Sequence, residues 1–161
     1  MPESRLHLTP WLLFASLLVV IDQGVKHWVT ATLQYGQPHP VVPGYFNLTL
    51  LHNTGAAFSL LAEAPGWQRW LFTGVAVVVV AWIVSSLRRL PPGSRWSALA
   101  LTLIMAGALG NCWDRVVDGY VTDFVQLCYR QACFPAFNVA DSAITVGAAM
   151  VLVDMLRELR G

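Results

Sequence analysis

Long apolar stretches alternate with shorter polar ones along this chain. The first apolar stretch begins at Leu8 and continues past two charged residues to Val29. Three more stretches contain few charged residues, and each has about the length of a helix that crosses a bilayer, which needs roughly 20 residues. The four expected spans are residues 8–29, 68–87, 96–113 and 136–156. Because these spans and their connections use up a chain of 161 residues, we expect one membrane-embedded domain over residues 1–161.

Basic residues gather on one side of this arrangement. Lys and Arg are enriched in loops that face the cytoplasm, so their positions predict the orientation of the chain. Both termini should lie inside, and residues 30–67 and 114–135 should lie outside the cytoplasm. The basic residues concerned are Arg5, Arg88, Arg89, Arg95, Arg157 and Arg160.

The first outer segment carries the alternating pattern of a strand. Apolar and polar residues alternate over residues 45–50, and Asn53-Thr54-Gly55 offers a turn before residues 56–61. We expect a small β-hairpin or curled sheet here, in which Gly55 supplies the backbone freedom of the turn. The predicted fold class is an all-α polytopic membrane protein with a small extracytoplasmic sheet between its first and second helices.

The composition agrees with a membrane protein and excludes one class of partner. Hydrophobic residues make up 56% of the chain and charged residues 12%, and the mean hydropathy is +0.56. Soluble domains carry about 25% charged residues. The net charge of +1 comes without a cluster of Lys and Arg on a polar face, so we expect no nucleic-acid partner.

The cysteines do not form a recognisable metal site. Cys112, Cys128 and Cys133 contain no CxxC motif and have no suitably spaced histidines, so zinc is not expected. We expect three free thiols, with one alternative: Cys128 and Cys133 can form a disulfide if their segment faces an oxidising compartment.

Acidic residues lie where the chain is otherwise apolar, and carboxylates near lipid are costly and usually functional. Asp141 precedes Arg157 by sixteen residues, or roughly 24 Å of helix, which places it toward the outer boundary of a hydrocarbon core about 30 Å thick. Asp123 follows the third span closely and should reach the same interface. Asp22 and Lys26 are four residues apart on one helix face, where they can form an ion pair that neutralises both charges.

Two carboxylates at one interface are compatible with aspartic-protease chemistry. One can activate a water as a general base while the other, held protonated by its neighbour, polarises a peptide carbonyl. The sequence contains neither GxSxG nor HExxH, the motifs of two competing hydrolase classes. From the residues alone, a proton-coupled carrier that uses the same acids and a purely structural pair of acids remain alternatives.

Five blocks of the sequence, in order along nearly the whole chain, resemble the signature blocks of bacterial lipoprotein signal peptidase, or signal peptidase II. Five ordered blocks are highly specific, whereas one alone would not be. Cys112-Trp113 depart from the pattern, because a smaller or different apolar pair is expected there, and this concerns local packing. The five blocks are Asp22-Gln23 with Lys26, Asn53-Thr54-Gly55-Ala56-Ala57-Phe58-Ser59, Gly110-Asn111-Cys112-Trp113-Asp114-Arg115, Val121-Thr122-Asp123-Phe124 and Phe137-Asn138-Val139-Ala140-Asp141-Ser142.

The resemblance implies an aspartyl endopeptidase of the bacterial inner membrane, without metal or organic cofactor, whose active site lies at the periplasmic face. It implies cleavage of a diacylglyceryl-modified prolipoprotein just before the lipidated cysteine, and inhibition by globomycin-type cyclic peptides. Asp123 and Asp141 match the catalytic dyad. The positions that match the polar surroundings and the supporting block are Asn53, Gly55, Asn111, Arg115, Asn138, Asp22 and Lys26.

For two of these residues, the sequence also supports a local structural interpretation. Arg115 follows Asp114 directly, and the two can form a simple ion pair at the membrane interface. Asn138 lies three residues before Asp141, which places both on one helix face and allows a hydrogen bond that orients the carboxylate.

Overall fold

The structure is a computed structural model, and it describes residues 7–55, 66–129 and 132–159. Within these residues, four helices are long and apolar enough to cross a membrane, as the sequence predicts. The first three extend beyond the predicted spans because hydrogen bonding continues into the polar flanks, whereas the fourth begins three residues later than predicted. The helices are α1 (Leu8–Thr32), α2 (Trp67–Arg89), α3 (Arg95–Val117) and α4 (Val139–Glu158).

Helix α3 is the centre of the helical part of the molecule. It packs against α1, α2 and α4, and it carries most of the buried helical residues. The core on one side of α3 includes Ile83, Leu87 and Met105, all almost completely buried. The outward faces of the other helices remain apolar and exposed, for example at Val20 and Val78. Lipid is as apolar as these side chains, so such faces need no protein cover in a bilayer.

Two glycines allow the backbones of α3 and α4 to approach closely. A Cβ atom at Gly147 on α4 would lie 2.6 Å from the carbonyl oxygen of Ala100 on α3. A Cβ atom at Gly107 on α3 would overlap the carbonyl oxygen of Ala140 on α4. Small residues at such contacts are typical of packed membrane helices. This contact fixes the start of α4 against the end of α3, where the polar residues lie.

An antiparallel sheet follows the order β1-β2-β3-β4 in the described residues, with bounds β1 (His39–Val42), β2 (Phe46–Asn53), β3 (Val121–Tyr129) and β4 (Ala132–Cys133). The expected strand over residues 45–50 is present within β2. The expected placement between the first two helices is wrong in part, because β3 and β4 come from the segment between α3 and α4. Alternation predicts a strand but does not identify its partner. The expected second arm, residues 56–61, lies outside the described residues.

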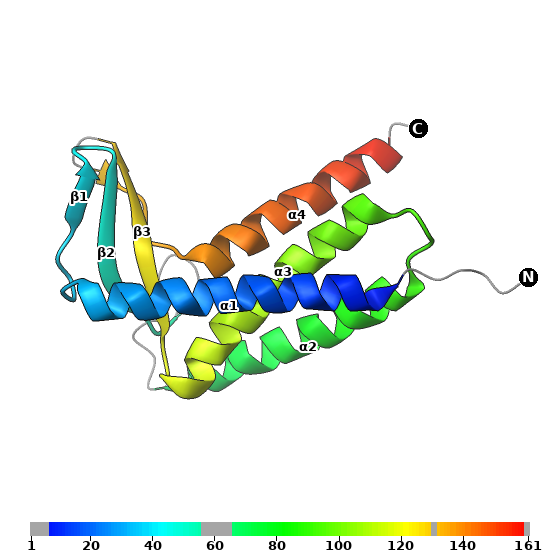
Figure 1. The fold of residues 1–161 in the computed structure, drawn as a ribbon, viewed down its shortest axis with the longest axis horizontal. Coiled ribbons are helices and arrows are strands. Elements are labelled where there is room, and N and C mark those ends of the chain that lie inside the picture. Colours follow the sequence, from blue (N-terminus) through cyan, green and yellow to red (C-terminus); the bar gives the residue numbers. More distant parts are fainter. Residues whose placement is uncertain (1–6, 56–65, 130–131, 160–161) are drawn as a thin grey trace, which may run out of the picture.

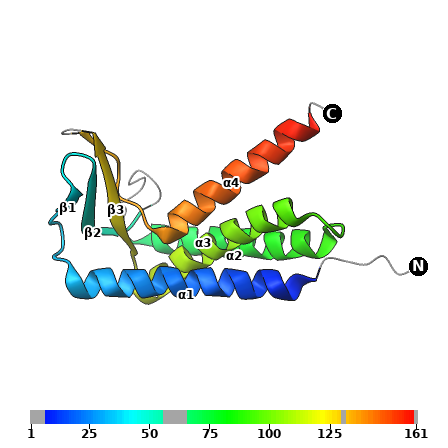
Figure 2. The same cartoon turned by 45° about the horizontal axis from the view of Figure 1, so that its top comes forward.

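The sheet lies at one end of the helices. Figures 1 and 2 show β1, β2 and β3 beside the last turns of α1, while the start of α1 and the end of α4 lie at the opposite end of the molecule. The connection between α2 and α3 lies at that opposite end as well (Figure 1). The basic residues Arg88, Arg89, Arg95 and Arg157 belong to these ends of their helices.

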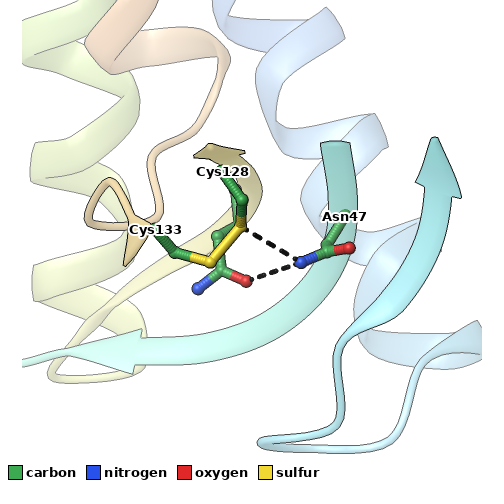
Figure 3. The surroundings of a disulfide bond; sticks show 4 residues. Asn47, Cys128 and Cys133 are labelled. Atoms are coloured by element: carbon green, nitrogen blue, oxygen red, sulfur yellow. Dashed lines mark hydrogen bonds between the residues drawn. A yellow bond between two sulfur atoms is a disulfide. The ribbon is translucent and has the colours of Figure 1, made fainter. Parts of the chain in front are cut away.

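Cys128 and Cys133 form a disulfide, so the expectation of three free thiols is wrong. The two residues are directly opposite each other in the β3–β4 pairing, with their Cα atoms 4.0 Å apart. A spacing of five residues does not by itself reveal such a tight reversal of the chain. The side-chain amide of Asn47 lies beside the bond, 3.4 Å from Cys128 Sγ (Figure 3). Cys112 is a free cysteine.

Candidate active site

Asp123 is held at the third position of β3, opposite Leu51 of β2. Its side chain is almost completely buried, with 3% of its surface exposed. Each carboxylate oxygen accepts one amide hydrogen bond: Oδ2 from Asn53 Nδ2 at 3.1 Å and Oδ1 from Asn138 Nδ2 at 2.8 Å. Asn53 reaches Asp123 because it ends β2 one diagonal step away on the same face of the sheet.

Asp141 occupies the first turn of α4 and is only half-buried. Its Oδ1 accepts a hydrogen bond from Asn111 Nδ2 at 2.7 Å, and its Oδ2 accepts one from the backbone N–H of Asn138 at 3.2 Å. The helix begins after Asn138, whose side-chain oxygen accepts from the backbone N–H of Asp141 at 2.8 Å. The predicted orienting bond between Asn138 and Asp141 is therefore present, but it belongs to a capping box and not to a helix face.

One fully buried residue, Asn138, joins the two aspartates. Its side-chain oxygen caps α4 at Asp141, while its Nδ2 donates to Asp123 and also lies 3.2 Å from Asn111 Oδ1. Asn111 in turn donates to Asp141. The structure thus brings together both predicted carboxylates and two of the predicted amides, from β3, α3 and the start of α4.

The surroundings of Asp123 favour its protonated form. Burial, and next the negative charge of Asp141, raise the pKa of Asp123 from its ordinary value of 3.8 to about 7. The amide hydrogen bonds from Asn53 and Asn138 and the charge of Lys26 act in the opposite direction. Burial is the larger effect, so near neutral pH Asp123 holds a proton for much of the time.

A buried ionic cluster supports the pair from the side of α1. Lys26 Nζ lies 2.8 Å from Asp22 Oδ2, as the sequence predicts, and equally 2.8 Å from Asp114 Oδ2. It also donates to Asn111 Oδ1 at 3.1 Å. Because an ammonium group only donates, it requires the oxygen of Asn111 to face Lys26 and leaves the Asn111 amide to donate to Asp141.

Asp22 has a second role, at the start of α4. Its Oδ1 accepts a hydrogen bond from the backbone N–H of Ala140 at 2.9 Å. Together with the Asn138 cap, this bond satisfies two of the free N–H groups of the first turn. A carboxylate near a helix N-terminus is also favoured by the helix dipole. Asp22 therefore connects the middle of α1 to the turn that carries Asp141.

Sequence reasoning missed two polar residues of the site, Asp114 and Gln23. Asp114 is 2% exposed, accepts from Gln23 Nε2 at 2.6 Å, and accepts from the backbone N–H of Thr122 at 3.2 Å. It thereby links α1, α3 and the start of β3. The signal for Asp114 was its position three residues after Asn111, which places both on one face of α3. Its ionic partner is Lys26, so the alternative of a simple Asp114–Arg115 pair is wrong.

Arg115 is directed toward the end of β2. Its Nη2 donates to the carbonyl oxygen of Gly55 at 3.0 Å, and its Nη1 donates to that of Asn111 at 3.2 Å. The backbone N–H of Gly55 donates to Asn53 Oδ1 at 3.0 Å, so Gly55 joins the site through its backbone. The Nε atom of Arg115 is buried and has no hydrogen-bond partner among the described residues.

The arrangement is suited to acid–base chemistry on a water molecule. Asp141 is partly exposed and accepts one amide hydrogen bond on each of its oxygens. Asp123 is buried and retains a proton to higher pH. Within residues 7–55, 66–129 and 132–159, no group of three or more His, Cys, Asp or Glu side chains is placed to hold a metal ion.

Comparisons with known proteins agree on one family. The sequence model of the family Signal peptidase (SPase) II matches residues 14–157. A lipoprotein signal peptidase of Cupriavidus necator is 53% identical over 93% of this chain and 85% of its own length. A lipoprotein signal peptidase of Pseudomonas aeruginosa is 50% identical over 98% of this chain and 94% of its own length.

A solved structure has the same fold. A bacterial membrane enzyme determined by the in meso method at 2.3 Å resolution superposes with a TM-score of 0.86, at 27% identity, over 99% of this chain and 94% of its own. Sequence and fold agree over nearly the full length, and the matched region contains every site residue described above. The chain therefore belongs to the signal peptidase II family.

Proposed function

We propose that this chain is an aspartic endopeptidase in which Asp123 and Asp141 form the catalytic dyad. The observation that carries the proposal is the pair of carboxylates joined through Asn138, one buried and one partly exposed. The pKa of Asp123 is raised to about 7, so this carboxyl group holds a proton for much of the time near neutral pH. One shared proton is the state that a pair of aspartates needs for peptide hydrolysis.

The hydrogen bonds support a division of roles within the dyad. Asp141, ionised, removes a proton from a water molecule whose oxygen attacks the peptide carbonyl carbon. Asp123 gives its proton to the carbonyl oxygen, which produces a neutral gem-diol. When the gem-diol collapses, one hydroxyl proton returns to Asp123, Asp141 protonates the leaving nitrogen, and the C–N bond breaks. Both carboxyl groups then have their original protonation.

We propose that three further residues hold the substrate. The guanidinium of Arg115 donates to the carbonyl oxygens of Gly55 and Asn111 and is thereby fixed at the end of β2. Asn53 and the backbone of Gly55 lie between Arg115 and Asp123. We propose that this edge aligns the peptide backbone beside the dyad, while Asn111, Asn138, Asp22 and Lys26 hold the carboxylates in position.

We propose that the substrate is a diacylglyceryl-modified prolipoprotein, cut just before its lipidated cysteine to release the signal peptide. The names of the relatives, all lipoprotein signal peptidases, support this assignment. The apolar outer faces of the helices suit a bilayer in which the signal peptide and the lipid chains are also embedded. Globomycin-type cyclic peptides are the expected inhibitors.

We also propose that the protein lies in the bacterial inner membrane with both termini in the cytoplasm and the site at the periplasmic face. Two observations support this orientation. Arg88, Arg89, Arg95 and Arg157 lie at the ends of the helices away from the sheet, as the positive-inside rule predicts for cytoplasmic ends. The Cys128–Cys133 disulfide lies in the sheet, and disulfides persist in oxidising compartments such as the periplasm.

The test uses purified protein in detergent with lipidated and unlipidated prolipoprotein. The wild-type protein should cut the lipidated substrate, Asp123→Asn and Asp141→Asn should each abolish cleavage while remaining folded, and a globomycin-type peptide should block cleavage. Full activity in either variant would disprove the dyad. Absence of product from both substrates would favour the proton-coupled carrier. Accessibility of a tag in residues 90–94 from the periplasm would disprove the orientation.

A further inference from the structure

The two aspartates lie at the two ends of one folded-back segment of chain. From Asp123 the chain runs outward along β3 and returns through β4 and residues 134–137 to Asn138 and Asp141. Backbone hydrogen bonds join the two arms near the dyad, where Val125 and Phe137 exchange both of their bonds, at 2.8 and 3.0 Å. Farther out, the N–H of Phe134 donates to the carbonyl oxygen of Leu127 at 2.7 Å.

The Cys128–Cys133 disulfide joins the same two arms covalently near the outer end. Cys128 lies five residues after Asp123, and Cys133 lies five residues before Asn138. The bond therefore connects the arm that carries Asp123 to the arm that carries Asn138 (Figure 3). The disulfide reinforces a short strand pairing. Strand β4 has two residues, and it pairs with β3 through Cys128↔Cys133 and Tyr129↔Ala132.

The two arms differ in how well they are held. The outgoing arm, β3, pairs with β2 over most of its length. The returning arm is exposed over residues 132–135, and exposed backbone hydrogen bonds compete with water and open readily. A slip of one residue in a strand pair sends each side chain to the opposite face. A slip of the returning arm would therefore displace Asn138. The Nδ2 atom of this residue donates a hydrogen bond to Asp123 at 2.8 Å, and its side-chain oxygen caps the helix that carries Asp141.

We propose that Cys128 and Cys133 are positioning residues of the peptidase, and that their disulfide fixes the register of the hairpin that joins the two aspartates. The inference rests on the proposed function. Reduction by a dithiol breaks the S–S bond, gives two thiols on the enzyme and oxidises the dithiol to its own disulfide. The returning arm is then held by non-covalent contacts alone, chiefly its backbone hydrogen bonds and those of Asn138, and the dyad is aligned for a smaller part of the time. Cys133 is exposed, so a reductant has access to the bond.

The test compares three forms of the full-length enzyme in detergent: oxidised wild type, wild type reduced with dithiothreitol, and the double variant Cys128→Ser/Cys133→Ser. Thiol labelling and mass measurement count the free cysteines, which should rise from one to three on reduction. Lipidated prolipoprotein is the substrate, and kcat and KM are measured separately. Misalignment of reacting groups by about 1 Å costs up to roughly 100-fold in rate. Because the hairpin is loosened only for part of the time, we expect kcat to fall roughly tenfold and KM to change less than twofold.

The double variant is the control for side effects of the reductant. It should match the reduced wild type, and dithiothreitol should not change its rate. Removal of the reductant and reoxidation should restore kcat in the wild type but should not change kcat in the double variant. Asn47→Ala, which removes the amide beside Cys128 Sγ but leaves the covalent bond, should keep the oxidised rate.

Two results would overturn the inference. Equal kcat in oxidised and reduced wild type, with a drop in melting temperature only, would make the disulfide a simple stabilising link. A rise in KM at constant kcat would assign the hairpin to substrate binding instead of dyad geometry. If the oxidised wild type cuts no lipidated substrate, the proposed function fails and this inference fails with it. If the enzyme cuts the substrate at the same rate in its oxidised and reduced forms, only this inference fails.

Discussion

Asn138 performs two tasks with two different atoms, and a matched pair of substitutions separates them. Its Oδ1 caps α4 at the N–H of Asp141, while its Nδ2 donates to Asp123. Asn138→Ser keeps an acceptor for the cap but removes the amide donor. Asn138→Ala removes both. Ser and Ala are similar in size, so the space left in this fully buried position is nearly the same in the two variants.

The magnitudes follow from the two kinds of hydrogen bond. Loss of a helix cap costs about 1 kcal/mol, so Asn138→Ala should be less stable than Asn138→Ser by about that amount. For a chain of this size, 1 kcal/mol corresponds to roughly 2–4 °C in melting temperature. A hydrogen bond to a charged group contributes about 1.5–3 kcal/mol. Both variants lose one such bond to ionised Asp123.

The bond to Asp123 governs the upper pH limit of activity. The dyad works while Asp123 is protonated, and its pKa of about 7 sets the alkaline limb of the pH–rate profile. The Asn138 amide stabilises the ionised form, so its loss raises the pKa of Asp123. At 1.36 kcal/mol per unit, the limb should move upward by about one to two units in both variants.

The assay is a pH–rate profile of kcat for lipidated prolipoprotein, together with thermal unfolding in the same detergent. The expected pattern is an equal upward shift of the alkaline limb in both variants and a lower melting temperature for Asn138→Ala than for Asn138→Ser. An alkaline limb that stays in place or moves downward in both variants would refute the role of the amide. Equal melting temperatures would refute the cap.

Three further predictions concern stability, measured by unfolding in detergent. The pKa of Asp123 is raised in the folded protein from 3.8 to about 7. Between pH 4 and pH 7 the unfolded chain therefore ionises this group while the folded protein keeps it largely protonated, which removes about 3 kcal/mol of stability. Asp123→Asn should flatten this decline, and an equally steep decline in the variant would contradict the prediction. Lys26→Met leaves Asp22 and Asp114 buried without their cation, which should cost about 3–5 kcal/mol of stability. Adding Asp114→Asn should recover part of this loss. A further loss of stability in the double variant would disprove the charge argument. Gly147→Ala places a Cβ 2.6 Å from a backbone oxygen and should cost about 1–3 kcal/mol of stability. In the control Gly74→Ala the new Cβ meets no atom within 4 Å, so this variant should not destabilise the protein. Equal effects of the two substitutions would refute the packing argument.

The sequence contained enough information for the helices because each is set by a local property. A run of apolar residues near bilayer length predicts a membrane-crossing helix wherever it packs, and all four such helices are present among the described residues. The same holds for the ion pair of Asp22 and Lys26, since a spacing of four residues on a helix fixes their proximity. The strand over residues 45–50 was also visible from its alternation.

The partners of these elements were not visible, because they depend on contacts between distant parts of the chain. Strand β2 pairs with β3, about seventy residues later, and that pairing places Asn53 beside Asp123. Asp114 looked like one half of a local pair with its neighbour, yet it is bonded to Lys26 on another helix. The Cys128–Cys133 bond likewise depends on the reversal of the chain between β3 and β4.

By itself, the sequence determined the apolar helices, the two candidate catalytic aspartates and, through ordered motifs, the family. Only the tertiary structure decided how the two carboxylates differ: Asp123 is buried on a strand, while Asp141 is half-exposed at a helix start and is reached through Asn111 and Asn138. The reason is physical. Hydropathy and helical spacing act over a few residues, whereas burial, hydrogen-bond partners and the resulting pKa depend on the elements that pack around each carboxylate.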